Sequence, residues 1–253
     1  MTYRPDPTAA FPTALARTLA LIAGIWIVSD LGFYFLLPAL QREPSYNHDP
    51  IANATYYVFW IGVAVITFSH TYTTWRRYSR WHLFEKRGLS LVFWAGFFAV
   101  AITYTAYVLP SLPPFEWRTE WGPVPELPLA EPLYFLPKSF EIIFQQLLIL
   151  ALVLVLAAEG LSVRRISLAC ALLFGGMHLL LMFDQVPWSL VIRFVVVASL
   201  FGLVFPVLIL RVQNGLAYSF AIHWGYYALT VFLARQVGPT TLLDAVARTF
   251  TGQ

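Results

Sequence analysis

The feature that most limits the fold of this chain is a series of apolar runs long enough to cross a bilayer. A hydrocarbon core needs about 20 consecutive apolar residues in a helix, and such runs recur along the whole 253-residue sequence. Because they are continuous and do not alternate with polar residues, they predict helices and disfavour a barrel. The predicted spans are residues 13–40, 52–75, 89–109, 138–158, 166–183, 188–210 and 216–234. The sequence therefore predicts an all-α, polytopic transmembrane bundle of about seven spans.

The composition agrees with a membrane location. Hydrophobic residues make up 59% of the chain and charged residues 11%, whereas soluble domains carry about 25% charged residues. The net charge of +3 comes mainly from arginines in the predicted membrane loops. It gives no reason to expect nucleic acid as a partner, and membrane lipids and other integral membrane proteins are the expected partners. The single cysteine, Cys170, lies inside an apolar run, so no disulfide framework is expected.

Basic residues between the second and third predicted spans set the expected orientation. Arg76, Arg77, Arg80, Lys86 and Arg87 lie in this short connection, and the positive-inside rule places it in the cytoplasm. Counting spans from this loop puts the N-terminus inside and the C-terminus outside. The first run is too long for a cleavable signal and lacks a small-residue cleavage site, so it predicts a retained helix. We expect a multi-pass protein of a bacterial inner (plasma) membrane.

Two regions are expected along the chain. Residues 1–134 hold three spans and most of an acidic, Pro- and Trp-rich loop at 110–137, which the span count places on the extracytoplasmic side. Residues 135–253 hold four spans and a short tail. The loop is long enough for a lid but equally suits a surface cover. Asp30, near the middle of the first span, would ordinarily pair with a neighbouring hydroxyl or amide, and its role stays open.

Four ionisable side chains on four consecutive spans fall in the outer half of the predicted membrane. They are Glu141, His178, Arg193 and His223, placed in depth by the 1.5 Å rise per residue of a helix. An ionisable group left unpaired in hydrocarbon costs several kcal/mol, so each is a candidate functional residue. Each also has a structural explanation. Glu141 could pair with Arg193 or Lys138, and each histidine could be neutral and bonded to a hydroxyl or carbonyl.

Their common depth predicts that Glu141, His178 and His223 point into one cavity. Arg193 is expected within hydrogen-bonding reach of Glu141 or Asp184, because an arginine in an apolar span needs a carboxylate or carbonyls.

Beside His178, two glycines indicate close helix packing. Gly175 and Gly176 lack side chains and should let another backbone approach. Phe174 lies four residues before His178 and therefore shares its helix face.

Three short motifs resemble those of a known family. The segment Lys138-Ser-Phe-Glu-Ile-Ile-Phe-Gln-Gln146 resembles a Glu-Glu-x-x-x-Arg helix, Phe174-Gly-Gly-Met-His178 resembles Phe-x-x-x-His, and His223-Trp-Gly-Tyr-Tyr227 resembles His-x-x-x-Asn/Asp. In this order and spacing they resemble the CPBP family, which includes type II CAAX prenyl proteases and bacteriocin-processing or immunity proteins. The resemblance implies a CPBP-like core in residues 135–235.

The resemblance also implies an intramembrane glutamate protease. In such a site a glutamate aided by histidine activates water, and a second histidine with an asparagine holds the oxyanion. The chain departs from this pattern at three positions: Phe140 replaces the first glutamate, Gln145 the arginine and Tyr227 the final Asn or Asp. The residues that keep the expected type are Glu141, His178 and His223.

Three functions therefore stay open, and with them whether the chain is an enzyme. The first is a catalytically degenerate relative that serves as a scaffold or accessory subunit of a membrane assembly. The second is an active endopeptidase that uses Glu141, His178 and His223, supported by Phe174, Gln145, Arg193 and Tyr227. The third is a haem- or metal-binding membrane protein with the two histidines as ligands. Loss of the leading glutamate and the arginine favours the first, for which no cofactor or metal is expected.

Overall fold

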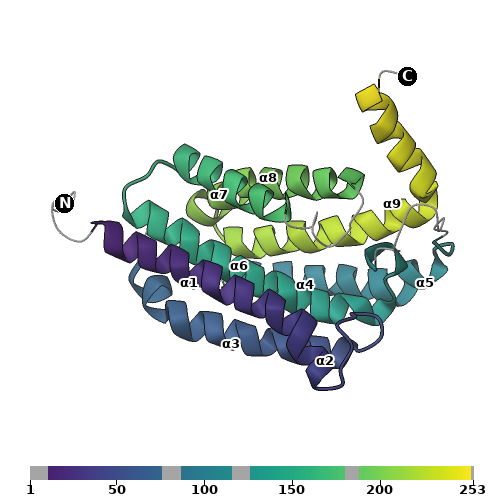
Figure 1. Cartoon of the computed structure of the whole chain (residues 1–253), viewed down its shortest axis with the longest axis horizontal. Helices are drawn as coiled ribbons and strands as arrows, with labels where there is room; N and C mark the ends of the chain where they lie inside the picture. The colour runs from purple at the N-terminus through teal and green to yellow at the C-terminus, as the bar shows by residue number, and fades with distance from the viewer. Residues whose placement is uncertain (1–10, 76–86, 116–125, 180–187, 252–253) are drawn as a thin grey trace.

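The computed structural model describes residues 11–75, 87–115, 126–179 and 188–251, and these residues form helices without any strand (Figure 1). The long helices are α1 (Phe11–Leu31), α3 (Pro50–Trp75), α4 (Arg87–Thr103), α6 (Phe135–Ala158), α7 (Val163–Met177), α8 (Trp188–Arg211) and α9 (Gly215–Thr251). The short ones are η1 (Gly32–Leu36), α2 (Leu37–Ala39), η3 (Tyr104–Val108), α5 (Leu109–Ser111), η5 (Leu127–Leu129) and η6 (Pro132–Tyr134). The prediction of an all-α fold is confirmed for these residues.

Five stretches are long and apolar enough to cross a membrane. They are Leu15–Ala39, Pro50–Thr74, Leu91–Ser111, Pro132–Ala158 and Val191–Arg211, and each coincides with a predicted span. Five such helices are the hallmark of a multi-pass membrane protein. The other two predicted spans, on α7 and α9, do not meet these criteria within the described residues, so the count of seven stays a prediction.

The bounds of α7 and α9 differ from those expected. The described helix of α7 has 15 residues, about 22 Å at 1.5 Å per residue. Residues 180–183, the predicted outer end of this span, lie outside the described residues. Most of the predicted short tail after residue 234 is helical, because α9 continues to Thr251. Pro239 lies within α9 and removes one backbone hydrogen bond, which can bend a helix without ending it. The last turns of α9 point away from the other helices (Figure 1).

The helix at the centre of the bundle is α6. It contacts α1, α3, α7, α8 and α9, and every residue from Leu148 to Leu156 is buried. A helix that is apolar on all sides belongs in lipid or among other helices, and α6 lies among other helices. Its end is well defined. Gly160 has a positive φ of 76°, and the N–H of Leu161 donates to the carbonyl of Leu156 at 3.2 Å, as in a Schellman cap.

Close packing of α7 on α8 depends on small residues. A Cβ on Gly202 would overlap the backbone of Cys170 and Ala171, and a Cβ on Gly175 would overlap the Ser199 side chain. Gly176 faces open space, so the predicted close approach holds for Gly175 alone. Glycine at such contacts lets two helix backbones come together where any other residue would separate them.

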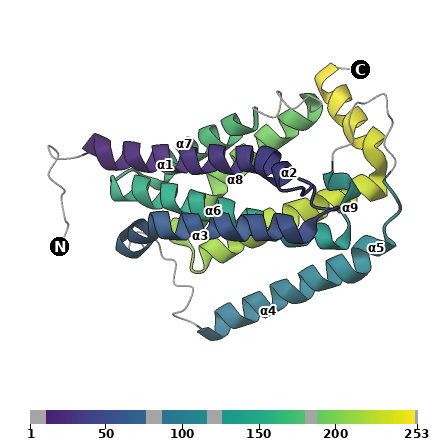
Figure 2. The same cartoon turned by 60° about the horizontal axis from the view of Figure 1, so that its bottom comes forward.

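In contrast, α4 is attached to the bundle by aromatic side chains. The Phe97 ring lies 5.3 Å from Phe220 and 5.5 Å from Trp224 on α9, between ring centroids. In η3, which directly follows α4, the Tyr104 hydroxyl donates to the carbonyl of Ala228 at 2.7 Å. Figure 2 shows α4 along one side of the molecule, apart from the remaining helices. Its outward side chains are apolar and exposed, for example Leu91 and Phe98.

Candidate functional site

Glu141 lies near the start of α6, where three side chains donate to its carboxylate. Gln145 Nε2 donates to Oε1 at 2.9 Å. Tyr46 Oη donates to Oε2 at 2.8 Å, and Lys138 Nζ bonds and ion-pairs with the same oxygen. Residues at i−3 and i+4 share one helix face, so α6 itself places Lys138 and Gln145 beside Glu141. The carboxylate therefore has partners on both oxygens.

Aromatic rings surround the ammonium of Lys138. It lies 4.5 Å from the ring centroid of Tyr227, 4.8 Å from that of Tyr46 and 6.0 Å from that of Tyr134. The Lys138 side chain is only 10% exposed and that of Glu141 15%. Ring faces attract cations, so these tyrosines compensate part of the hydration that the ammonium loses. The result is a largely buried ion pair inside an aromatic cage.

Arg193, which was expected near Glu141 or Asp184, contacts α9 instead. Its Nη2 donates to Thr230 Oγ1 at 2.9 Å, and its guanidinium carbon lies 5.8 Å from the centroid of the Tyr226 ring. In the described residues Lys138, and not Arg193, is the basic partner of Glu141, because it lies one turn away on the same helix while Arg193 on α8 faces α9. The other predicted partner, Asp184, lies outside the described residues.

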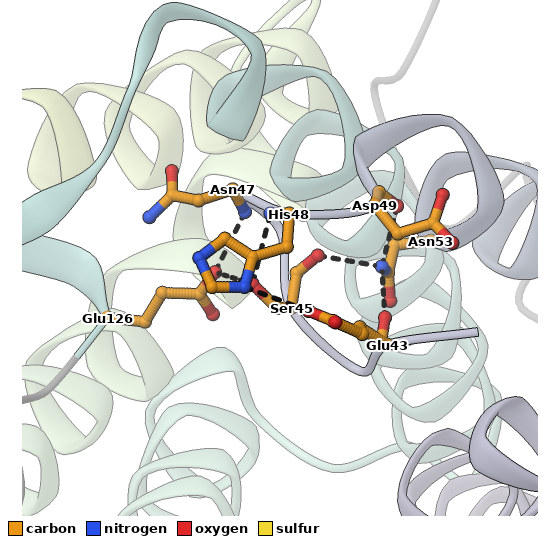
Figure 3. A network of polar contacts seen from close by, with 7 residues as sticks. All are labelled: Glu43, Ser45, Asn47, His48, Asp49, Asn53 and Glu126. Carbon is orange, nitrogen blue, oxygen red and sulfur yellow. Dashed lines mark hydrogen bonds and ion pairs between the residues drawn. The ribbon is translucent and has the colours of Figure 1, made fainter. Parts of the chain in front are cut away.

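Tyr46 reaches Glu141 from the connection between α2 and α3. This connection, residues 40–49, folds around Asn53, whose Nδ2 donates to the carbonyls of Glu43, Ser45 and Asp49 at 3.0, 2.9 and 2.7 Å (Figure 3). Burial of the Tyr46 phenol, and next the negative charge of Glu141, raise its pKa well above the usual value. The hydroxyl therefore stays protonated and donates to the carboxylate at physiological pH.

The loop at 110–137 holds this connection in place. Glu126 Oε1 accepts bonds from the Ser45 hydroxyl and from the backbone N–H of Asn47, both at 2.8 Å (Figure 3). The N–H of Glu131 donates to Asn47 Oδ1 at 2.9 Å. From α9, Arg235 donates to the carbonyl of Ala130 at 2.8 Å. The described part of the 110–137 loop therefore contacts both the connection and α9, whereas residues 116–125 lie outside the described residues.

Replacing Glu126 should loosen this cover. In Glu126→Ala the Ser45 hydroxyl and the Asn47 N–H lose a charged acceptor, a bond type worth about 1.5–3 kcal/mol. We expect backbone amides of residues 43–49 to exchange with deuterium about tenfold faster or more, measured by mass spectrometry. Glu131→Ala is the matched control, because the bond of Glu131 to Asn47 uses its backbone. Unchanged exchange in Glu126→Ala would contradict the assignment.

Both candidate histidines line one small cavity. Its volume is about 50 Å³, room for one or two water molecules. The polar and aromatic residues around it include Gln145, Phe174, His178, His223 and Tyr227. Glu141 is not among the lining residues but bonds to Gln145, which is. The expected convergence thus holds for the two histidines, while Glu141 lies one residue further from the cavity.

His223 contacts a polar pair that motif comparison missed. Its Nδ1 lies 3.5 Å from Gln146 Nε2, and Gln146 Oε1 accepts the Ser219 hydroxyl at 2.9 Å. The ring stacks on Tyr227, with centroids 5.4 Å apart. Gln146 and Ser219 are buried. A buried amide in an apolar span needs partners, so this rule would have marked Gln146 as hydrogen-bonded, although not to which residue.

His178 ends α7. Its Nδ1 lies 2.7 Å from the carbonyl oxygen of Phe174, and its ring stacks on Phe194 with centroids 6.2 Å apart. An Nδ1–H that donates to this carbonyl leaves Nε2 as the nitrogen that can accept a proton. Among the contacts described, neither histidine bonds to Glu141. The imidazoles and the carboxylate are therefore neighbours and not a hydrogen-bonded catalytic pair.

Fold and site define a class: a multi-pass helical membrane protein with a buried ion pair beside a small histidine-lined cavity. In the described residues, no three His, Cys, Asp or Glu side chains gather closely enough to hold a metal ion. No family model, curated protein or solved structure matches this chain.

Proposed function

We propose that this chain is a CPBP-like protein of a bacterial inner membrane that does not hydrolyse peptides and acts as a scaffold or accessory subunit. It would bind other integral membrane proteins, with its N-terminus in the cytoplasm and its C-terminus outside. The observation that carries the proposal is the state of Glu141, whose two carboxylate oxygens bond to Lys138, Tyr46 and Gln145.

A general base must reach the water that it activates at hydrogen-bond distance. Oε2 of Glu141 already accepts two donors and Oε1 one, and the carboxylate does not line the cavity. Three donors therefore occupy most of the roughly four acceptor positions of the carboxylate, including both of those on Oε2. The bonding supports a structural task for Glu141 over a catalytic one.

Two of the three replaced positions, Phe140 and Tyr227, also have structural tasks. Phe140 packs against the buried core, so an apolar ring stands where the resembling family has its leading glutamate. The Tyr227 ring contacts the Lys138 ammonium and stacks on His223. The Tyr227 ring therefore presents its faces to Lys138 and His223. In the resembling family, a short amide side chain at this position would donate a hydrogen bond to an oxyanion.

The surface of α4 favours binding to other membrane proteins. None of the residues in its apolar window is buried, and aromatic side chains are exposed on α4, such as Phe98, and on the following η3, such as Tyr107. Aromatic residues are enriched at protein–protein interfaces. A helix held to the bundle mainly by ring contacts leaves this whole outer face accessible within the membrane.

A peptidase assay tests the proposal. Purified wild type, Glu141→Ala and His178→Ala are compared on prenylated and hydrophobic peptides, and we expect no cleavage above background by any of them. In parallel, a photo-crosslinking residue at Val100, on the exposed face of α4, should capture the same few membrane proteins in repeated preparations. Cleavage by the wild type that both substitutions abolish would refute the proposal.

A second candidate is an active endopeptidase, and one observation favours it. His178 and His223 line the same water-sized cavity, with Gln145 between that cavity and Glu141. Under this alternative Glu141 would become a base only after Tyr46 moves away. The same assay distinguishes the two, with Tyr46→Ala added as a variant that should then cleave faster than the wild type.

A further inference from the structure

A second and larger hollow lies between the first two long helices, away from the histidine-lined cavity. It is an open groove of about 620 Å³. One wall comes from α1, η1 and α2 and the other from α3. The lining residues are Val28, Gly32, Leu36, Leu37, Leu40, Arg42, Asp49, Ile51, Ala52, Thr55, Tyr56, Phe59 and Trp60. Apart from Arg42 and Asp49 at one end, nearly all of this surface is apolar or aromatic.

The groove has the length of one leaflet. Val28, Gly32, Leu36 and Leu40 follow one another at every fourth position, so from Val28 to Leu40 there are twelve steps along the chain, about 18 Å at 1.5 Å per residue. Half of a hydrocarbon core is about 15 Å. The stripe runs to the end of the first candidate span at Ala39. It therefore lies in the leaflet next to the connection between α2 and α3.

The floor of the groove is fixed. The Tyr56 hydroxyl donates to the carbonyl of Ser29 at 2.5 Å, and a Cβ on Gly32 would overlap this hydroxyl. Tyr56 and Trp60 are both buried. Because Gly32 has no side chain, the Tyr56 hydroxyl can reach the backbone of α1 at the base of the groove. The groove is a built feature of the α1–α3 contact.

Two residues of opposite charge, Arg42 and Asp49, lie at one end of the groove. Arg42 Nη1 lies 3.6 Å from Asp49 Oδ2, and the Arg42 side chain is 59% exposed. Both residues lie just beyond the ends of candidate spans, at Ala39 and Pro50, which is the level of lipid headgroups. A guanidinium has five N–H donors and binds phosphate well. Only Nη1 of Arg42 faces Asp49, so the other N–H donors of the guanidinium can bind a phosphate.

We propose that this groove binds one phosphatidylethanolamine molecule. An acyl chain lies along the apolar stripe, the phosphate accepts bonds from Arg42, and the ammonium of the headgroup donates to Asp49. A zwitterionic headgroup with a phosphate and an ammonium a few bonds apart complements the arginine–aspartate pair in sign and in order. This inference is independent of the proposed function, because it uses neither Glu141 nor the histidines.

The test uses purified full-length protein and a phosphatidylethanolamine probe that carries a diazirine in one acyl chain. After irradiation, cross-links should concentrate on peptides that contain residues 28–40 and 51–60. Thr55→Trp fills the groove from its exposed edge, and we expect it to reduce this labelling about tenfold, a change of about 1.4 kcal/mol in binding. The matched control is Val58→Trp, which adds the same side chain on α3 outside the groove and should leave labelling unchanged.

The headgroup contacts are tested separately. Arg42→Gln removes a charge-assisted bond to phosphate and should weaken binding of the probe about tenfold, with no effect on a diacylglycerol probe. Asp49→Asn should weaken binding of phosphatidylethanolamine but not of phosphatidylglycerol. Equal labelling of wild type and Thr55→Trp, or labelling spread evenly over α4 and the groove, would show surface lipid only and overturn the proposal. Unchanged binding in Arg42→Gln overturns it as well, and this variant decides the matter if Thr55→Trp does not fold.

Discussion

Lys138→Met should be strongly destabilising, by about 3–5 kcal/mol in the free energy of unfolding. The substitution keeps the length of the side chain but leaves the Glu141 carboxylate largely buried without its cation. Tyr46 and Gln145 still donate to it, yet two neutral donors replace only part of the hydration that a carboxylate loses. The measurement is unfolding in mild detergent, followed by near-ultraviolet circular dichroism.

The double variant Lys138→Met with Glu141→Gln shows whether the loss comes from the unpaired charge. Removing both charges should recover most of the stability, because a buried pair is often replaceable by neutral groups of similar size. Arg164→Met is the control, since this arginine is exposed at the start of α7 and its loss should cost less than about 0.5 kcal/mol. A double variant as unstable as Lys138→Met would mean that the aromatic cage needs the ammonium itself.

Gly202→Ala should also destabilise the protein, by about 1–3 kcal/mol. The new Cβ would overlap the backbone of Cys170 and Ala171, and no rotamer change can relieve a clash between a Cβ and a backbone. Helix α8 must therefore move away from α7. Phe201 and Phe205, on the same helix, line the cavity with His223, so the cavity should widen as well.

Gly225→Ala on α9 is the matched control for this prediction. The substitution is identical in chemistry, but a Cβ at Gly225 meets nothing within 4 Å. Because alanine favours a helix over glycine by up to about 1 kcal/mol, we expect it to be neutral or slightly stabilising. Thermal unfolding of both variants in the same detergent gives the comparison. Equal midpoints would show that α7 and α8 accommodate the extra methyl group.

Much of the candidate site follows from helix periodicity. The spacing of Lys138, Glu141 and Gln145 places all three on one face of any helix, so their contacts could be predicted from α6 alone. The depth argument correctly brought His178 and His223 to one cavity. It could not choose Lys138 over Arg193 as the cation, because depth along a helix does not determine the direction in which a side chain points.

The sequence by itself determined the class of fold. Twenty apolar residues in a row can satisfy their backbone in a membrane only as a helix, and five predicted spans appear accordingly. Only the tertiary structure decided what surrounds Glu141. Tyr46 arrives from a connection 95 residues away in sequence, held by Asn53 and Glu126, and a polar loop carries no periodic signal for its path. Bonds within one helix are local and readable from spacing, whereas bonds between distant segments depend on how the helices pack.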